Sequence, residues 1–238
     1  MVRYAARIAL EHQSSDSWTS RLATETDSRP IIEGTIALVR SAGNSDDQKR
    51  SARKTFDAAI NKIAWNDLDL DKKLCFIRAI DLAICRLGKP SQQILSTAEK
   101  LVDVFPTGDR QLDRELAKLL VATGNSSATE KVVQLLETSP GKLDQIDLAL
   151  TLIDAKAGWT KELREQYFEW FSKIASAKGG NSFGGYVSSI RKKAIGKLNG
   201  EQKSDLAEVL ERAKNTAKAA KVQPVPVSYT HLTLPTKA

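Results

Sequence analysis

The stretch 114–136 reads RELAKLLVATGNSSATEKVVQLL and contains the pattern that decides the fold. Before Gly124, apolar residues recur at the three- and four-residue spacing that places them on one face of a helix: Leu112, Leu116, Leu119 and Leu120. After a short Asn/Ser turn, Val132, Leu135 and Leu136 repeat that spacing. Because a glycine just past the last turn commonly ends a helix, the stretch predicts two amphipathic helices joined by a tight turn.

Helical spacing recurs along most of the chain and predicts an all-α fold. Apolar stripes with this spacing occupy Ile32–Val39, Phe56–Ile63, Ile77–Leu87 and Ile146–Ile153. Capping-box spacing marks three expected helix starts: Ser45-x-x-Gln48, Ser127-x-x-Glu130 and Asn199-x-x-Gln202. We therefore expect ten or more helices and no sheet in residues 1–221.

Four glycines set the expected repeat. Gly43, Gly88, Gly124 and Gly158 follow apolar stripes and are 45, 36 and 34 residues apart, and each is expected in the left-handed helical conformation. Each interval holds about two helices, the period of helical-hairpin repeats, and residues 114–136 resemble a HEAT-like repeat. Hairpins bury their apolar faces by stacking, so we predict an α-solenoid of degenerate HEAT-like hairpins in residues 1–158. An irregular all-α bundle is the alternative.

Residues 159–221 have a different character and are predicted to form a C-terminal helical cap. Tyr167, Phe168, Trp170 and Phe171 fall within five residues, so their helix should be buried on two sides. We expect one buried cluster of Trp159, Phe168, Trp170 or Phe171, and Phe183, with Tyr186 packing back on the aromatic helix. The glycine-rich segment 178–185 lacks the Lys-Ser/Thr of a phosphate-binding loop and follows no strand, which favours a tight corner between helices.

The chain carries 36 Lys and Arg against 29 Asp and Glu, a formal net charge of +7. Residues 191–221 hold nine basic and four acidic residues. This excess suits either an anionic partner such as nucleic acid or a solvated helix face. The stretch 191–221 has no aromatic residue to stack on bases, which favours the solvated face.

No set of residues indicates catalysis, cofactor binding or a metal site, so the predicted catalytic, cofactor-binding and metal-ligating residues are none. Cys75 and Cys85 are about 15 Å apart along one expected helix, too far for a disulfide, and are expected to be small buried residues. His12 is expected to be structural. No apolar run reaches the ~18 residues of a membrane span. No signal peptide precedes the first amphipathic pattern, which alone suggests a cytoplasmic chain but also suits the interior of a longer one.

The last residues break every pattern above. Val227–Thr236 is β-prone, uncharged and matches the conceptual translation of a transposase mosaic-end sequencing adapter. We therefore expect 222–226 to be a linker, 227–238 to be a disordered artefact, and the natural protein to continue beyond about Pro226. His231 then belongs to no site.

Four groups of residues together resemble the helical region of large secreted haem proteins of the planctomycete type. They are Ala5–Gln13 with Trp18, Arg114–Leu120, Gly158–Thr160 with Tyr167–Phe171, and Gly179–Tyr186 with Ile190. In that family a propeller resembling sugar dehydrogenases precedes a HEAT-like region, and a c-type cytochrome module with Cys-x-x-Cys-His follows. The resemblance implies an extracytoplasmic location and a haem-containing parent protein, in which any oxidoreductase activity belongs to the other modules. The chain contains neither the propeller nor the haem motif, so no catalytic or haem-ligand residue carries over.

Two functions follow from these observations. The first is a non-catalytic helical scaffold or spacer whose partners are neighbouring domains of the longer haem protein or another protein. The alternative is a freestanding basic HEAT-like protein that binds nucleic acid along a concave face. That alternative needs Lys and Arg on successive inner helices, but before residue 190 the inner stripes carry Asp and Glu nearly as often. The first function is therefore favoured, without nucleic acid, membrane span or cofactor in this chain.

Overall fold

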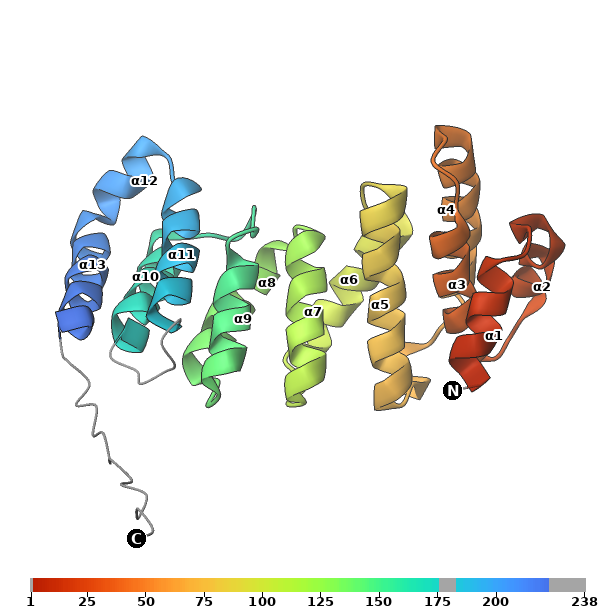
Figure 1. Cartoon of the computed structure of the whole chain (residues 1–238), viewed down its shortest axis with the longest axis horizontal. Helices are drawn as coiled ribbons and strands as arrows, with labels where there is room; N and C mark the ends of the chain where they lie inside the picture. Colours follow the sequence, from red (N-terminus) through yellow and green to blue (C-terminus); the bar gives the residue numbers. More distant parts are fainter. Residues whose placement is uncertain (1, 176–182, 223–238) are drawn as a thin grey trace, which may run out of the picture. The chain divides into compact units, whose positions relative to one another are not determined.

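A computed structural model describes residues 2–175 and 183–222, and within these residues the chain is helical with no β-strand (Figure 1). Thirteen α-helices and two short 3₁₀ helices account for the described elements, which confirms the all-α prediction. The chain divides after Thr160 into two compact units. Residues 176–182, with the first part of the glycine-rich segment 178–185, and residues 223–238, with the predicted adapter-derived tail, lie outside the described residues.

The first unit is a stack of helical hairpins, as predicted for a solenoid. Helices α1, α3, α5, α7 and α9 form one layer in which each packs on the next, and α4, α6 and α8 form a second layer behind it (Figure 1). The bounds are α1 Val2–Glu11, η1 Ser15–Ser17, α2 Thr19–Thr24, α3 Ser28–Ser41, α4 Asp46–Ile60, η2 Trp65–Asp67, α5 Leu70–Leu87, α6 Gln92–Val104, α7 Arg110–Ala122, α8 Ser126–Thr138 and α9 Lys142–Leu152.

The residues that cap the helix starts repeat from one hairpin to the next. The front helices α3, α5 and α7 each start after an aspartate whose side chain accepts a hydrogen bond from a backbone N–H of the first turn: Asp27, Asp69 and Asp109. The rear helices α4, α6 and α8 start after Ser45, Ser91 and Asn125 in the same way. The capping boxes at Ser45 and Asn199 are confirmed. The one predicted at Ser127 is wrong, because Asn125 accepts from two backbone N–H groups and starts the helix two residues earlier.

The four glycines predicted to end helices (the stop glycines) all follow a helix of the front layer, but they do not share one backbone conformation. Gly124 and Gly158 have φ of +74° and +77°. Gly88 has φ +93° and ψ −153°, a region open to glycine but outside the predicted left-handed helix. The prediction for Gly43 is wrong: its φ is not positive, because α3 ends through Ala42 in an extended conformation and Ser45 starts the next helix at once.

Apolar stripes on both layers form the core of the first unit. The α3 helix, whose two sides face α1 and α5, is buried along almost its whole length from Ile31 to Val39. In α7, the predicted leucine stripe is buried, with Leu116, Leu119 and Leu120 fully inaccessible. Cys75 is half-buried and Cys85 is exposed, so the expectation that both are buried is wrong for Cys85.

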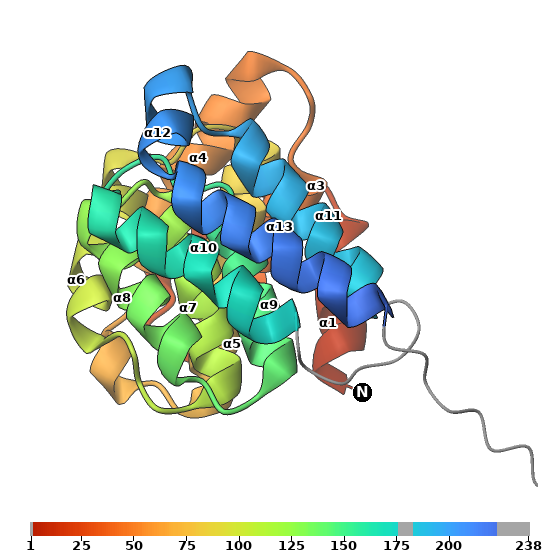
Figure 2. The same ribbon diagram turned by 90° about the vertical axis from the view of Figure 1, so that its left-hand side faces the viewer.

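The second unit contains α10 Lys161–Ala175, α11 Phe183–Gly196, α12 Gly200–Asp205 and α13 Ala207–Val222. Helices α11 and α13 pack on α10, and α13 runs beside it (Figure 2). Phe168, Trp170 and Phe171 are buried as predicted, and Tyr167 makes edge contacts with both phenylalanines at ring separations of 5.2 and 5.3 Å.

Two other aromatic residues differ from the expected cluster, and the place of Trp159 in that cluster stays a prediction. The Trp159 Nε1–H donates to the carbonyl of Ala155 (2.9 Å). Phe183 is only half-buried. Tyr186 is 50% exposed, so the prediction that it packs back on the aromatic helix is wrong. The apolar face of α11 is instead supplied by Val187, Ile190 and Ala194.

Candidate functional site

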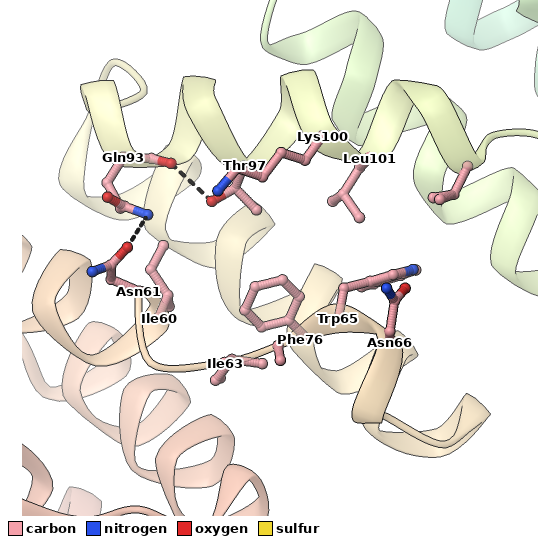
Figure 3. A pocket seen from close by; sticks show the side chains of 12 residues that line it. Ile60, Asn61, Ile63, Trp65, Asn66, Phe76, Gln93, Thr97, Lys100 and Leu101 are labelled. Carbon is pink, nitrogen blue, oxygen red and sulfur yellow. Dashed lines mark hydrogen bonds between the residues drawn. The ribbon is translucent and has the colours of Figure 1, made fainter.

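A groove of about 320 Å³ lies in the first unit between the end of α4, the η2 turn and α6 (Figure 3). Its apolar surface comes from the side chains of Ile60, Ile63, Phe76, Leu101 and Val104. Trp65 of η2 forms one wall, and the side chains of α6 point towards it from the opposite side. This volume is at the lower end of those that bind small ligands or single side chains of a partner.

Two hydrogen bonds join the rear helices at one end of the groove. Gln93 Nε2 donates to Asn61 Oδ1 (3.1 Å), and Ser91 Oγ donates to Asp57 Oδ1 (2.7 Å). Both bonds connect the start of α6 to the last turn of α4 or the residue after it. They hold these two helix ends together, and beyond them the groove extends towards Trp65 (Figure 3).

The indole ring of Trp65 is held in place by two neighbouring side chains, Phe76 and Lys73. Its ring lies 6.2 Å from the Phe76 ring at an interplanar angle of 54°. The Lys73 ammonium lies 5.2 Å from the Trp65 ring centroid, within the range of a cation–π interaction. Trp65 is only half-buried, so part of an oriented aromatic surface faces the groove.

The polar groups around the groove are mostly hydrogen-bond donors. Among the described residues, neither Lys100 nor the side-chain amide of Asn66 has a hydrogen-bond or ion-pair partner, and the Trp65 Nε1–H donates no hydrogen bond. The Asn61 amide accepts through Oδ1, which leaves its Nδ2 hydrogens for a ligand. Figure 3 shows Asn61 and Gln93 at one end of the groove and Trp65 and Asn66 at the other. The groove can therefore bind a ligand rich in acceptor oxygens around an apolar part.

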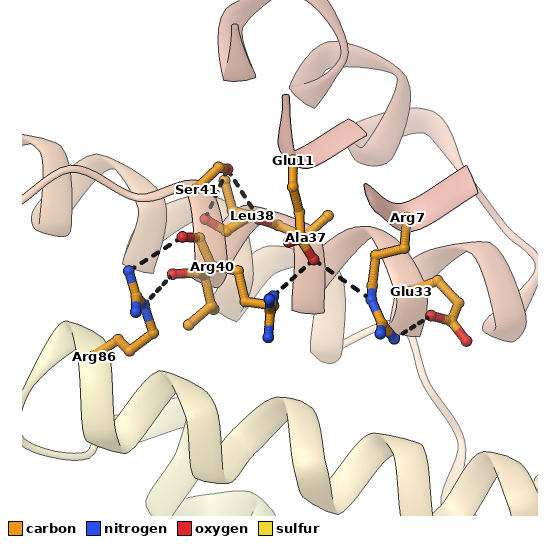
Figure 4. Close-up of polar contacts among 9 residues, drawn as sticks. Arg7, Glu11, Glu33, Ala37, Leu38, Arg40, Ser41 and Arg86 are labelled. Carbon is orange, nitrogen blue, oxygen red and sulfur yellow. Dashed lines mark hydrogen bonds and ion pairs between the residues drawn. The ribbon is translucent and has the colours of Figure 1, made fainter. Parts of the chain in front are cut away.

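Charged side chains on the front layer link successive helices (Figure 4). Between α1 and α3, Arg7 pairs with Glu33 (3.1 Å) and Arg40 pairs with Glu11 (2.8 Å). From α5, Arg86 donates to the carbonyl oxygens of Val39 and Arg40 at the end of α3 (3.0 and 3.1 Å). These are contacts between helices, and they leave few of the participating charges available to an outside partner.

Other basic side chains also bind the carbonyl oxygens at helix ends. Lys131 of α8 donates to Val102 O (2.6 Å) and Phe105 O (2.8 Å) where α6 ends. Lys62 donates to carbonyls at the end of α2, namely Leu22 O (3.5 Å) and Glu25 O (3.2 Å). Arg53 of α4 donates to Lys89 O just past α5 (2.6 Å). Because the C-terminal end of a helix carries partial negative charge, these cations stabilise the stack, and part of the +7 charge is structural.

The buried carboxylates of the first unit also have structural partners. Asp113 accepts from the backbone N–H groups of Thr107 (2.6 Å) and Gly108 (3.1 Å). Asp144 accepts from Arg110 Nε (2.7 Å) across the α7–α9 contact. These hydrogen bonds give both carboxylates a structural role in the hairpin stack.

One carboxyl group on the front layer has a raised pKa. Burial raises the pKa of Asp81 to about 6, the nearby Glu115 carboxylate adds to the increase, and Arg78 and Lys118 oppose it. Asp81 lies on α5 and Glu115 on α7, so the repulsion acts between two stacked helices. No group of three or more His, Cys, Asp or Glu residues suited to a metal occurs within residues 2–175 and 183–222.

The basic region predicted at 191–221 is partly neutralised within its own unit. Arg212 pairs with Glu169 (3.8 Å) and Lys214 with Glu211 (3.1 Å). Lys192 and Lys193 of α11 are exposed. Sequence reasoning found no aromatic residue in 191–221, but the exposed Tyr186 lies on the same helix, two turns before Lys193 and on the same side.

Sequence reasoning did not identify the groove. Its one available signal was Trp65, an aromatic residue in a short polar segment outside the apolar stripes on either side. The other lining residues come from α4, α5 and α6, and only packing brings them together. None of the described helices has the length and apolar character needed to cross a bilayer. No protein-family model matches the chain, and no similar curated protein or solved structure was found.

Proposed function

We propose that this chain is a non-catalytic helical scaffold that holds neighbouring domains or partner proteins. The observation that carries the proposal is the use of charged side chains between helices. Arg86, Lys131 and Lys62 bind helix-end carbonyls of neighbouring elements, and Arg110 pairs with Asp144 across the front layer. Such contacts favour a stack of fixed geometry, which suits a spacer or docking platform.

The finer proposal places the chain in a longer extracytoplasmic haem protein, between a propeller and a c-type cytochrome module. Its support is the resemblance of residues 5–18, 114–120, 158–171 and 179–190 to that family. The haem and any oxidoreductase activity then belong to the other modules. Adapter-free sequence of the gene beyond the codon for Pro226 tests this proposal. A Cys-x-x-Cys-His motif within about a hundred residues is the expected result, and its absence together with a stop codon would overturn the haem assignment.

The scaffold role has its own test. The module encoded next to this chain, expressed separately, should bind the full chain in isothermal titration calorimetry. The stack should remain intact on binding, with unchanged helical circular dichroism. Failure of the two neighbouring modules to bind would overturn the scaffold proposal, whatever the gene sequence shows.

A second candidate function is nucleic-acid binding through α11. It is favoured by the exposed Tyr186 together with Lys192 and Lys193 on a helix that has no acidic residue from Phe183 to Gly196. Stacking on an aromatic ring combined with backbone charge is how proteins bind single strands without sequence preference. Fluorescence anisotropy with a labelled oligothymidine, measured at several salt concentrations, distinguishes the two functions. The scaffold proposal expects no saturable binding at about 0.15 M salt. Saturable binding that Tyr186→Ala abolishes and Tyr186→Phe retains would favour nucleic acid.

A further inference from the structure

We infer that the groove between η2 and α6 binds an extended peptide segment of a partner protein, with an apolar side chain seated between Trp65 and Leu101 and a carboxylate beside Lys100. This inference rests on the scaffold proposal and specifies the chemistry of one docking site. It concerns the described residues that line the groove, which come from α4, η2, α5 and α6.

The apolar part of the groove is where an apolar side chain of the peptide, its anchor, would bind. Phe76 and Leu101 are 2% exposed and form the buried part of the groove, while Trp65 is only half-buried and Val104 is 38% exposed. A half-exposed indole, already oriented by Phe76 and Lys73, loses little conformational entropy when a side chain packs against it. Such pre-oriented aromatic residues are typical centres of protein–protein contacts.

The polar groups specify a peptide as the occupant. Donors lie at both ends of the apolar surface, Asn61 Nδ2 at one end and Asn66 and Trp65 Nε1 at the other (Figure 3). Gln93 can accept through Oε1 because its Nε2 already donates to Asn61. An extended peptide presents carbonyl oxygens on both sides of an apolar side chain, together with N–H groups, and so matches this distribution.

The unpaired charge of Lys100 favours a peptide with an acidic residue next to its apolar anchor. Lys100 lines the groove and has no ion-pair or hydrogen-bond partner among the described residues. The acidic residues of α6, Glu99 and Asp103, do not line the groove. The second nearby cation, Lys73, lies over the Trp65 ring. A carboxylate one or two residues from the apolar anchor can reach Lys100, whereas a basic side chain there would be repelled.

Protein NMR tests this inference directly, because the indole N–H of Trp65 gives its own signal. The full chain, labelled with ¹⁵N on its tryptophans, is titrated with the blocked pentapeptide Ac-Ala-Asp-Phe-Ala-Ala-NH₂, and Trp65→Phe assigns the signal. We expect a saturable shift of the Trp65 signal at millimolar peptide, with the signals of Trp18 and Trp170, both buried, unchanged. Replacing Asp by Lys or Phe by Ala in the peptide should weaken binding.

Two variants and a control identify the contacts. Lys100→Met should weaken the Asp-containing peptide about three- to fivefold, as expected for losing an exposed ion pair, without affecting a peptide with Asn in place of Asp. Thr97→Tyr should fill the groove and abolish the shift while circular dichroism stays unchanged. Lys54→Met is the matched control, because Lys54 is exposed on α4 and does not line the groove.

Three results would overturn the inference. The first is no shift of the Trp65 signal at about 10 mM peptide. The second is equal binding of the Lys-containing peptide. The third is equal binding of 3-phenylpropionate, which would indicate a site for small carboxylates. These outcomes differ from failure of the scaffold proposal. A neighbouring module that binds the full chain and the Thr97→Tyr variant equally shows docking elsewhere, whereas peptide binding without module binding leaves the groove as a peptide site alone.

Discussion

Gly158 and Gly124 form a matched pair that tests how closely the hairpins are packed. Both have positive φ, +77° and +74°, so an added side chain costs about 1–2 kcal/mol at either position. Their surroundings differ. A Cβ at Gly158 would lie 1.9 Å from the backbone oxygen of Ser126 at the start of α8, whereas a Cβ at Gly124 would meet nothing within 4 Å.

The clash sets the size of the difference. Neighbouring heavy atoms essentially never approach a Cβ closer than 3.0 Å, so α8 or the loop must shift by about 1 Å. The loop is tethered at that point, because Thr129 Oγ1 donates to Ala157 O (2.6 Å). Overpacking of this kind costs about 1–3 kcal/mol. We therefore expect Gly158→Ala to destabilise the fold by about 2–5 kcal/mol and Gly124→Ala by about 1–2 kcal/mol.

Urea unfolding of both variants and the unmodified chain provides the measurement. Helical circular dichroism and tryptophan fluorescence should be followed together, because stacked repeats can unfold in steps and a single free energy then loses its meaning. The expected result is a larger loss for Gly158→Ala than for Gly124→Ala. Equal losses, within about 0.5 kcal/mol, would refute the close approach of the loop to α8.

Three other predictions follow from the contacts described above. Lys131→Met removes two hydrogen bonds from a charged donor to carbonyls at the end of α6 and should cost about 2–3 kcal/mol in urea unfolding. The matched substitution Lys54→Met, at an exposed position, should change stability by less than about 0.5 kcal/mol, and equal effects would contradict a structural role for Lys131. Phe168→Ala and Phe171→Ala, at side chains only 1% exposed, should each cost about 3–5 kcal/mol, and an unchanged melting temperature in both would show that the aromatic core is misplaced. The pKa of Asp81 is raised from 3.8 to about 6 in the folded chain, so its protonated carboxyl group favours the folded state at low pH, and this contribution is lost as the pH rises through about 6. Asp81→Asn should therefore raise stability at pH 7 by on the order of 1–2 kcal/mol, allowing for partial exposure, and should flatten the pH dependence of stability between about 4 and 6. An unchanged pH profile would contradict the burial of Asp81.

The hairpin stack could be predicted from sequence because its signals are local. Leu116, Leu119 and Leu120 follow the helical period, and burial of that face is what the period implies. Capping depends on a few adjacent residues, which is why the boxes at Ser45 and Asn199 were correctly predicted. At α8 both Asn125 and Ser127 could serve as the N-cap, and the spacing of residues did not show that Asn125 is the one used.

The groove and the roles of the charged residues could not be predicted in this way. Lys131 and Lys100 are both lysines within amphipathic helices, and nothing nearby in the sequence distinguishes them. Lys131 donates to carbonyls 26 and 29 residues away, whereas Lys100 lies beside a groove without a protein partner. That difference depends on how α4, α6 and α8 are spaced along the stack. Tyr186 differs from the prediction for the same reason, because Val187 and Ile190 supply the packed face of α11 and leave the tyrosine exposed.

By itself the sequence determined the helices, most of their ends and the hairpin repeat, because hydrophobic period, capping side chains and stop glycines act over a few residues. Tertiary structure alone decided which cations are committed to helix ends, which carboxyl group has a raised pKa and where a groove remains. Those properties arise from distances between residues far apart in the chain, such as Arg86 and Val39, 47 residues apart, or Asn61 and Gln93, 32 residues apart. Burial and electrostatic interaction depend on such distances in space, which periodicity along the chain does not specify.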